Sequence, residues 1–148
     1  MNEPRNLGIL LLEDDADDAR QLKSALDKTG LPIGVHQERD GVKALQYLLN
    51  LDVRSNLTPR PDLILVDLKI HGLSGLAFIE MIKKEERLCI IPLVVFGTST
   101  LPADISRAYS LGAASYFVKD ADPDKLFETV ARMCDYWFHL VRLPETHY

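Results

Sequence analysis

Three apolar runs in this chain each end on ionisable side chains. The residues that follow these runs are Glu13 with Asp14, Asp67, and Lys119. If the runs are parallel strands, their carboxyl ends meet at one edge of a sheet, and we expect these side chains to converge there. Carboxylate oxygens bind hard divalent cations, and a lysine ammonium can contact both a carboxylate and a phosphoryl oxygen. The pattern therefore predicts a site for a divalent cation and a phosphoryl group.

The predicted site carries an excess of negative charge. At about 4 Å and an effective dielectric constant of about 20, each pair of like charges costs roughly 4 kcal/mol. The acids therefore need protonation or an ion such as Mg²⁺, which takes only one or two carboxylates from a protein. Small residues such as Gly75 in the loop after Asp67 let backbone approach a ligand, so the Lys69 carbonyl is a further candidate metal ligand. Alternatively, the acids at 13–15 do no more than cap the helix that follows.

The segments between these residues alternate strand-like and helix-like patterns, which is typical of a parallel sheet. Apolar runs predict strands buried on both faces, and apolar residues at helical spacing predict helices. The expected strands are 7–12, 33–38, 63–66, 93–96 and 115–118, and the expected helices are 17–28, one from 41, 74–86, 102–111 and 123–141. We expect the α/β class, with a doubly wound five-stranded parallel sheet of order 2-1-3-4-5 and five helices, flavodoxin-like.

Two segments carry more specific expectations. The helix over 74–86 should bury Leu76, Ile79, Met81 and Ile82, which the pattern places on one face. The polar segment 52–61 holds two prolines and is long for a connection between a helix and a strand, so we expect an exposed excursion there.

The length and the net charge of the chain exclude some classes of protein. The 148 residues suggest one domain, and 22 acidic against 17 basic residues give a net charge of −5, which argues against non-specific nucleic-acid binding. No apolar run reaches the roughly 18 residues of a membrane span, and we recognise no signal peptide. We therefore expect a cytoplasmic protein with no membrane contact, in which Cys89 and Cys134 are buried thiols.

These motifs together resemble the response-regulator receiver domain of two-component signalling. The resemblance rests on the acid pair 13–14, the segment 67–75 and the ending 116–119, and it extends over about 7–141. It implies one receiver domain, 1–148 with a short tail 142–148, that is a signalling module rather than an enzyme. It also implies that a sensor histidine kinase donates a phosphoryl group to Asp67 with Mg²⁺. Glu13 and Asp14 would be the metal carboxylates, Lys119 the phosphate-facing lysine, and Tyr116 the aromatic that turns inward on activation.

A narrower resemblance is to the single-domain regulators that are paired with bacterial phytochromes. It rests on the long excursion before position 60, the acidic pair 17–18, the long last helix, and the tail from Trp137 to Pro144.

The chain departs from the receiver pattern at three positions. Receivers place Ser or Thr at the end of the fourth strand, and the family interval from Lys119 leads instead to Gly97. Either Thr98 substitutes through a small register change, which is our choice, or the hydroxyl is missing. His71 replaces a usual proline, and we interpret it as a loop residue and not a ligand. Asp120 replaces the proline that often follows the lysine, so we expect no cis bond there.

The last helix is apolar over two adjacent stripes, which is wider than a surface helix needs. The stripes are Leu126, Val130, Met133, Trp137 and Val141, and beside them Phe127, Cys134 and Phe138. We interpret the surplus, Phe138 with Leu140 or Leu143, as a surface for homodimerisation through the last strand and last helix. The alternative is that all of these residues are core.

Three other functions fit part of the pattern. A phosphohydrolase using Asp67 as nucleophile would need an acid where Lys69 stands. A flavin or nucleotide binder would need a phosphate loop where the acids at 13–15 stand. A receiver that acts without phosphorylation is disfavoured by the complete set of acids, although Gly97 argues for it.

Overall fold

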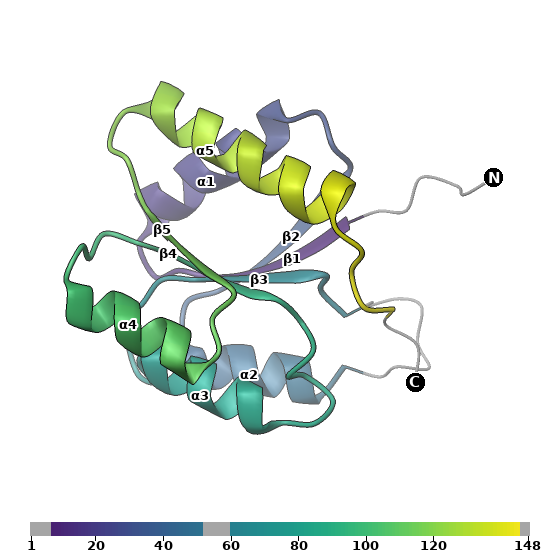
Figure 1. Ribbon diagram of the computed structural model, residues 1–148, viewed down its shortest axis with the longest axis vertical. Helices are drawn as coiled ribbons and strands as arrows, with labels where there is room; N and C mark the ends of the chain where they lie inside the picture. Colours follow the sequence, from purple (N-terminus) through teal and green to yellow (C-terminus); the bar gives the residue numbers. More distant parts are fainter. Residues whose placement is uncertain (1–6, 52–59, 146–148) are drawn as a thin grey trace.

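The computed structural model describes residues 7–51 and 60–145. Strands and helices alternate along the chain, and one sheet lies between two layers of helices (Figure 1). The elements are β1 (Leu7–Leu12), α1 (Ala16–Lys28), β2 (Ile33–Glu38), α2 (Gly41–Leu49), β3 (Leu63–Val66), α3 (Gly75–Lys84), β4 (Leu93–Gly97), α4 (Pro102–Leu111), β5 (Ser115–Val118), α5 (Pro123–Asp135) and a final π-helical turn, η1 (Tyr136–Leu140).

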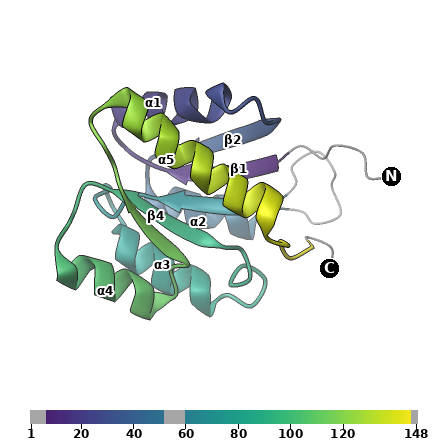
Figure 2. The same ribbon diagram turned by 45° about the horizontal axis from the view of Figure 1, so that its top comes forward.

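The sheet is parallel throughout, with strand order β2-β1-β3-β4-β5, so the predicted fold class and order are confirmed. Helices α1 and α5 cover one face, and α2, α3 and α4 cover the other (Figures 1 and 2). The strand order changes direction between β1 and β3, which is where an open α/β sheet leaves a crevice at its carboxyl edge. Glu13 and Asp67 directly follow these two strands.

The core has two halves because side chains alternate across each strand. On β1, Leu10 and Leu12 pack with α2, α3 and α4, whereas Ile9 and Leu11 pack with α1 and α5. The same alternation continues along β3 and β4, and all of these side chains are almost fully buried. A sheet covered on both faces holds its strand ends firmly, and this positions the ionisable residues that follow them.

Side-chain caps set where the helices begin. Asp15 precedes α1 and accepts a hydrogen bond from the Asp18 amide at 2.9 Å, and Ser74 and Asp122 do the same for α3 and α5. Such caps satisfy amides that the first helical turn leaves without partners. Asp15 and Asp122 follow the ends of β1 and β5 within a few residues, so the first turns of α1 and α5 lie near the carboxyl edge of the sheet.

The structure corrects the predicted buried face of α3. Met81 is 44% exposed, and the buried positions are Gly75, Phe78, Ile79 and Ile82. These positions follow the spacing i, i+3, i+4, i+7 of one helical face, from which Met81 is displaced. Cys89 is also less buried than expected, whereas Cys134 is buried as predicted.

The end of the last helix differs from the prediction. The α-helix ends at Asp135, and the chain continues as η1, closed by a bond from the Val141 amide to the Tyr136 carbonyl at 3.1 Å. The wider π turn lets the consecutive residues Trp137 and Phe138 both pack against the core formed with α1. Phe138 therefore packs on the core and does not add to an exposed surface, so the prediction for this residue is wrong. The residue left most exposed is Leu140, at 71%.

Two further predictions concern the rest of the chain. Most of the expected excursion, 52–59, lies outside the described residues. None of the helices in the described ranges has the length and apolar character needed to cross a membrane.

Candidate functional site at the carboxyl edge of the sheet

Asp67 lies at the centre of the site. It follows β3, is only 6% exposed, and its amide donates to the Leu12 carbonyl on β1 at 3.0 Å. One carboxylate oxygen, Oδ1, accepts from the Lys69 amide at 3.0 Å, and the other, Oδ2, accepts from the Lys119 ammonium at 2.8 Å. The carboxylate is thus held in one orientation by the loop that follows it and by the residue that ends β5.

Lys119 joins three carboxylates. Its Nζ donates to Asp67 at 2.8 Å, to Glu13 at 2.5 Å and to Asp18 at 3.1 Å, and its side chain is 11% exposed. Its backbone amide donates to the Gly97 carbonyl at 2.8 Å, which fixes its place beside β4. The predicted convergence of Glu13, Asp67 and Lys119 is therefore present.

Burial dominates the electrostatics of this group. Burial raises the pKa of Glu13 to about 7, although the hydrogen bond and charge of Lys119 lower it, and the nearby charge of Asp67 raises it further. Burial on its own would lower the pKa of Lys119, but its hydrogen bonds to Asp67 and Glu13 raise that pKa above its usual value. One ammonium therefore compensates the three acids only in part.

The donor set suits a hard divalent cation. Glu13, Asp18 and Asp67 each offer one carboxylate oxygen, and these oxygens lie within 4.8 Å of one another. Three carboxylates against one ammonium leave two negative charges, which a divalent cation would balance. Oxygen ligands of this kind are those that Mg²⁺ and Mn²⁺ take in proteins.

Asp18 is a member of this group that was not predicted from the sequence, where the acidic pair 17–18 served only as one feature of the narrower resemblance. The available signal was its position: Asp18 is the third residue of α1, three places after the capping Asp15. The carboxylate of Asp14 is not among these three. Its Oδ2 accepts from the His71 amide at 3.1 Å and contacts the His71 ring nitrogen Nδ1. The role of Asp14 as a metal ligand stays a prediction, and so does that of the Lys69 carbonyl.

Gly97 lies beside the Asp67 carboxylate. A Cβ atom built at Gly97 would lie 3.4 Å from Asp67 Oδ1. The Thr98 side chain is exposed and borders a hollow of about 250 Å³ between α1 and α5, together with Asp18 and Lys119. Position 97, which faces Asp67 Oδ1, thus carries no hydroxyl.

Tyr116, on β5, is half-buried, and its hydroxyl donates to the Ser99 carbonyl at 2.9 Å. Burial raises the pKa of Tyr116. The Ser99 hydroxyl in turn donates to Asp104 in α4 at 2.5 Å. The expected trans geometry of the Lys119–Asp120 bond is also found.

A doubly wound parallel sheet with an acid-and-lysine group at its switch point defines a signalling domain of the receiver type. Residues 9–131 match the response regulator receiver domain. The chain belongs to this family, as the sequence motifs predicted.

Relatives and solved structures agree with this assignment. The structure of the phosphorylated cyanobacterial phytochrome response regulator RcpA is 34% identical, has a TM-score of 0.86, and aligns over 95% of this chain and 100% of that one. Response regulator Rcp1 of Synechocystis is 32% identical over 92% of both chains, and its Mn²⁺-bound structure has a TM-score of 0.83. The probable methanogenesis regulatory protein FilR2 of Methanothrix harundinacea is 35% identical over 92% of this chain and 86% of its own length.

The narrower resemblance to phytochrome-linked regulators is confirmed by the likeness to RcpA. Receiver domains are signalling proteins that interact with sensor histidine kinases and hold a divalent metal at an acidic pocket. The group formed by Glu13, Asp18 and Asp67 fits such a pocket.

Proposed function

We propose that this chain is one receiver domain, 1–148, that accepts a phosphoryl group on Asp67 from a sensor histidine kinase and signals through its own surface. The observation that carries the proposal is the environment of Asp67. This carboxylate is buried at a strand end, oriented by the Lys69 amide, and paired with Lys119 among further acids. A buried, oriented carboxylate beside an ammonium is suited to attack an electrophilic phosphorus and to hold the product.

In the transfer, an oxygen of Asp67 attacks the phosphorus of a phosphohistidine. The new P–O bond forms as the P–N bond breaks, and the electron pair of the broken bond stays on the imidazole nitrogen. The Lys119 ammonium, 2.8 Å from the same carboxylate, neutralises charge on the incoming phosphoryl oxygens. Bound Mg²⁺ would supply further positive charge. Its ligands would be drawn from Glu13, Asp18 and Asp67, with Asp14 and the Lys69 carbonyl as predicted additional candidates.

Incubation with acetyl phosphate and Mg²⁺, followed by intact mass measurement, tests the acceptor. The wild type should gain one phosphoryl group, and Asp67→Asn should gain none. Asp17→Asn is the matched control, because Asp17 is an exposed acid in α1 that pairs only with Arg20 among the described residues. An adduct of equal size on wild type and Asp67→Asn would show that the acceptor lies elsewhere.

The metal is tested in the same reaction. With EDTA in place of Mg²⁺ the adduct should form much more slowly, and Glu13→Gln should need more Mg²⁺ for the same rate. A protein that is phosphorylated equally well with and without the ion would contradict this part of the proposal.

The proposed donor is a sensor histidine kinase of the phytochrome type, in the cytoplasm. Support comes from the likeness to RcpA along almost the whole chain. Transfer from purified phosphorylated kinases tests this pairing. A phytochrome kinase should transfer at least tenfold faster than an unrelated kinase, and equal rates would refute it.

We further propose a homodimer through β5 and the end of the last helix. Val118 on β5 and Tyr136 and Leu140 in η1 are exposed apolar residues, at 43%, 49% and 71%. Light scattering at micromolar concentration, with and without acetyl phosphate, should show a dimer that Leu140→Glu weakens. Lys119→Ala should still be phosphorylated but should not change its association state. A monomer under both conditions would refute the dimer.

A further inference from the structure

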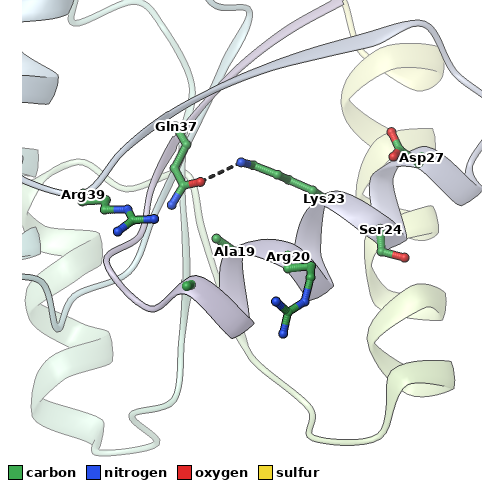
Figure 3. Close-up of a pocket in the computed structure, with 8 residues that line it drawn as sticks. Ala19, Arg20, Lys23, Ser24, Asp27, Gln37 and Arg39 are labelled. Atoms are coloured by element: carbon green, nitrogen blue, oxygen red, sulfur yellow. Dashed lines mark hydrogen bonds between the residues drawn. The ribbon is translucent and has the colours of Figure 1, made fainter.

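A hollow of about 430 Å³ lies between α1 and β2, on the opposite side of α1 from α5 (Figure 3). Ala16 and Ala19 lie on the α1 side of it, and their small side chains leave the space open. Its volume is within the range of small-molecule sites. None of the acids around Lys119 borders it, so it is separate from the candidate acceptor site.

Three cationic side chains surround this hollow: Arg20 and Lys23 from α1, and Arg39 from the end of β2. Asp27 is the one carboxylate among the lining residues. The chain as a whole has a net charge of −5, so a local excess of positive charge here runs against its overall composition. Among the lining residues, three cations thus stand against one carboxylate.

The hydrogen-bond partners show how weak the compensation is. The half-buried Lys23 ammonium donates to the neutral Gln37 amide oxygen at 2.6 Å. The Gln37 amide nitrogen donates to the Glu13 carbonyl at 3.1 Å, which orients its oxygen toward Lys23. Arg20 pairs with Asp17, but both side chains are 73% exposed, and exposed pairs of this kind are easily exchanged. Within residues 7–51 and 60–145, Arg39 has no ion pair or hydrogen bond.

We propose that the hollow formed by Arg20, Lys23 and Arg39 binds a compact oxyanion of the phosphate class. Guanidinium and ammonium groups form their strongest hydrogen bonds with such oxygens, and the Ser24 hydroxyl at the rim can donate as well. No aromatic ring lines the hollow to stack on a base. The lining therefore favours an inorganic or simple organic phosphate over a nucleotide. This site does not depend on the proposed phosphoryl transfer to Asp67.

Calorimetric titration with pyrophosphate, in EDTA at constant ionic strength, tests the site. We expect saturable binding to the wild type, about tenfold weaker binding to both Lys23→Gln and Arg39→Gln, and nearly unchanged binding to Lys125→Gln. Lys125 is an exposed cation on α5, so its loss changes the net charge equally at a distant place. Thermal unfolding with pyrophosphate should show the same order of midpoint shifts.

Asp67→Asn separates this site from the acceptor. Pyrophosphate affinity should be the same in that variant as in the wild type. Binding that disappears in Asp67→Asn, that falls equally in Lys125→Gln, or that is absent from the wild type would overturn the proposal.

Discussion

Replacing Gly97 with alanine should stabilise the protein, although the residue lies beside the candidate acceptor. Gly97 ends β4, and its φ is not positive, so its backbone does not require glycine. An added Cβ would lie 3.4 Å from Asp67 Oδ1 and 3.9 Å from the Leu68 amide, which is ordinary van der Waals contact. Alanine restricts the unfolded chain, so the free energy of unfolding should rise by about 0.5–1 kcal/mol. For a chain of this size the melting temperature should rise by about 2 °C.

Gly75 provides the matched comparison. Its Cβ would lie 2.5 Å from Leu68 Cα and 2.6 Å from the Asp67 carbonyl oxygen, both backbone atoms that cannot move aside easily. Gly75→Ala should therefore destabilise the protein by about 1–3 kcal/mol, as overpacking does. Urea unfolding of both variants in EDTA measures the two effects. If Gly97→Ala loses stability, or if the two substitutions behave alike, the reasoning about space around Asp67 is wrong.

Gly97→Ser extends the prediction from stability to chemistry. A serine hydroxyl at this position would reach Asp67 Oδ1 or a phosphoryl oxygen attached to it. The aspartyl phosphate should survive longer in Gly97→Ser than in the wild type, because the added hydroxyl can donate a hydrogen bond to a phosphoryl oxygen. Gly97→Ala controls for filled space without a donor. Equal half-lives for serine and alanine variants would show that the missing hydroxyl has no effect.

Three more predictions follow from buried groups. Lys119→Met leaves the acids uncompensated, so without metal the free energy of unfolding should fall by about 3 kcal/mol. In thermal unfolding, saturating Mg²⁺ should stabilise this variant more than it stabilises the wild type. An equal gain in stability in both proteins would contradict this expectation. Burial raises the pKa of Cys134 to about 11 from 9.0, so between these pH values the folded state retains a proton that the unfolded chain releases. The free energy of unfolding should therefore fall by about 2–3 kcal/mol as pH rises through this window, and Cys134→Val should lose that part of the slope. Phe138→Ala should cost about 2 kcal/mol because Phe138 packs on the core, whereas Leu140→Ala should change stability by less than about 0.5 kcal/mol in urea unfolding.

The strands and their order could be predicted from the sequence because buried parallel strands leave a strong pattern. The runs at β1, β3 and β5 are apolar and end abruptly on Glu13, Asp67 and Lys119. Parallel pairing then brings those strand ends to one edge of the sheet, and this does not depend on the conformations of the loops. The same logic explains why the contact between Asp67 and Lys119, fifty-two residues apart, was predictable.

The remaining site contacts depend on geometry that the pattern does not carry. Whether Asp17 or Asp18 points toward Lys119 is set by the rotation of α1 about its axis, which follows from packing against α5. Asp14 is turned toward His71 by a contact between two loops, and sequence spacing says nothing about such a contact. The π turn after Asp135 was missed because its bonding departs from the 3.6-residue period on which the helix prediction relied.

Two bonds tie the end of β5 to the end of β4. The Lys119 amide donates to the Gly97 carbonyl, and the hydroxyl of Tyr116, three residues earlier, donates to the Ser99 carbonyl beyond the end of β4. Ser99 in turn donates to Asp104 at the start of α4. A displacement of Lys119 can therefore be transmitted to α4 through the Tyr116–Ser99 and Ser99–Asp104 hydrogen bonds, without a side chain at position 97.

This route bears on how a receiver with glycine beside its proposed acceptor can signal. A phosphoryl group on Asp67 would carry up to about two negative charges in place of the single charge of the carboxylate. Lys119 is the one cation in contact with that carboxylate among the described residues. Its ammonium must then divide its bonds between the phosphoryl oxygens, Glu13 and Asp18. Since Lys119 directly follows the short strand β5 that carries Tyr116, a shift of Lys119 strains the Tyr116 bond to the segment after β4. The signal in this chain should therefore depend on the lysine more strongly than in receivers that also use a hydroxyl.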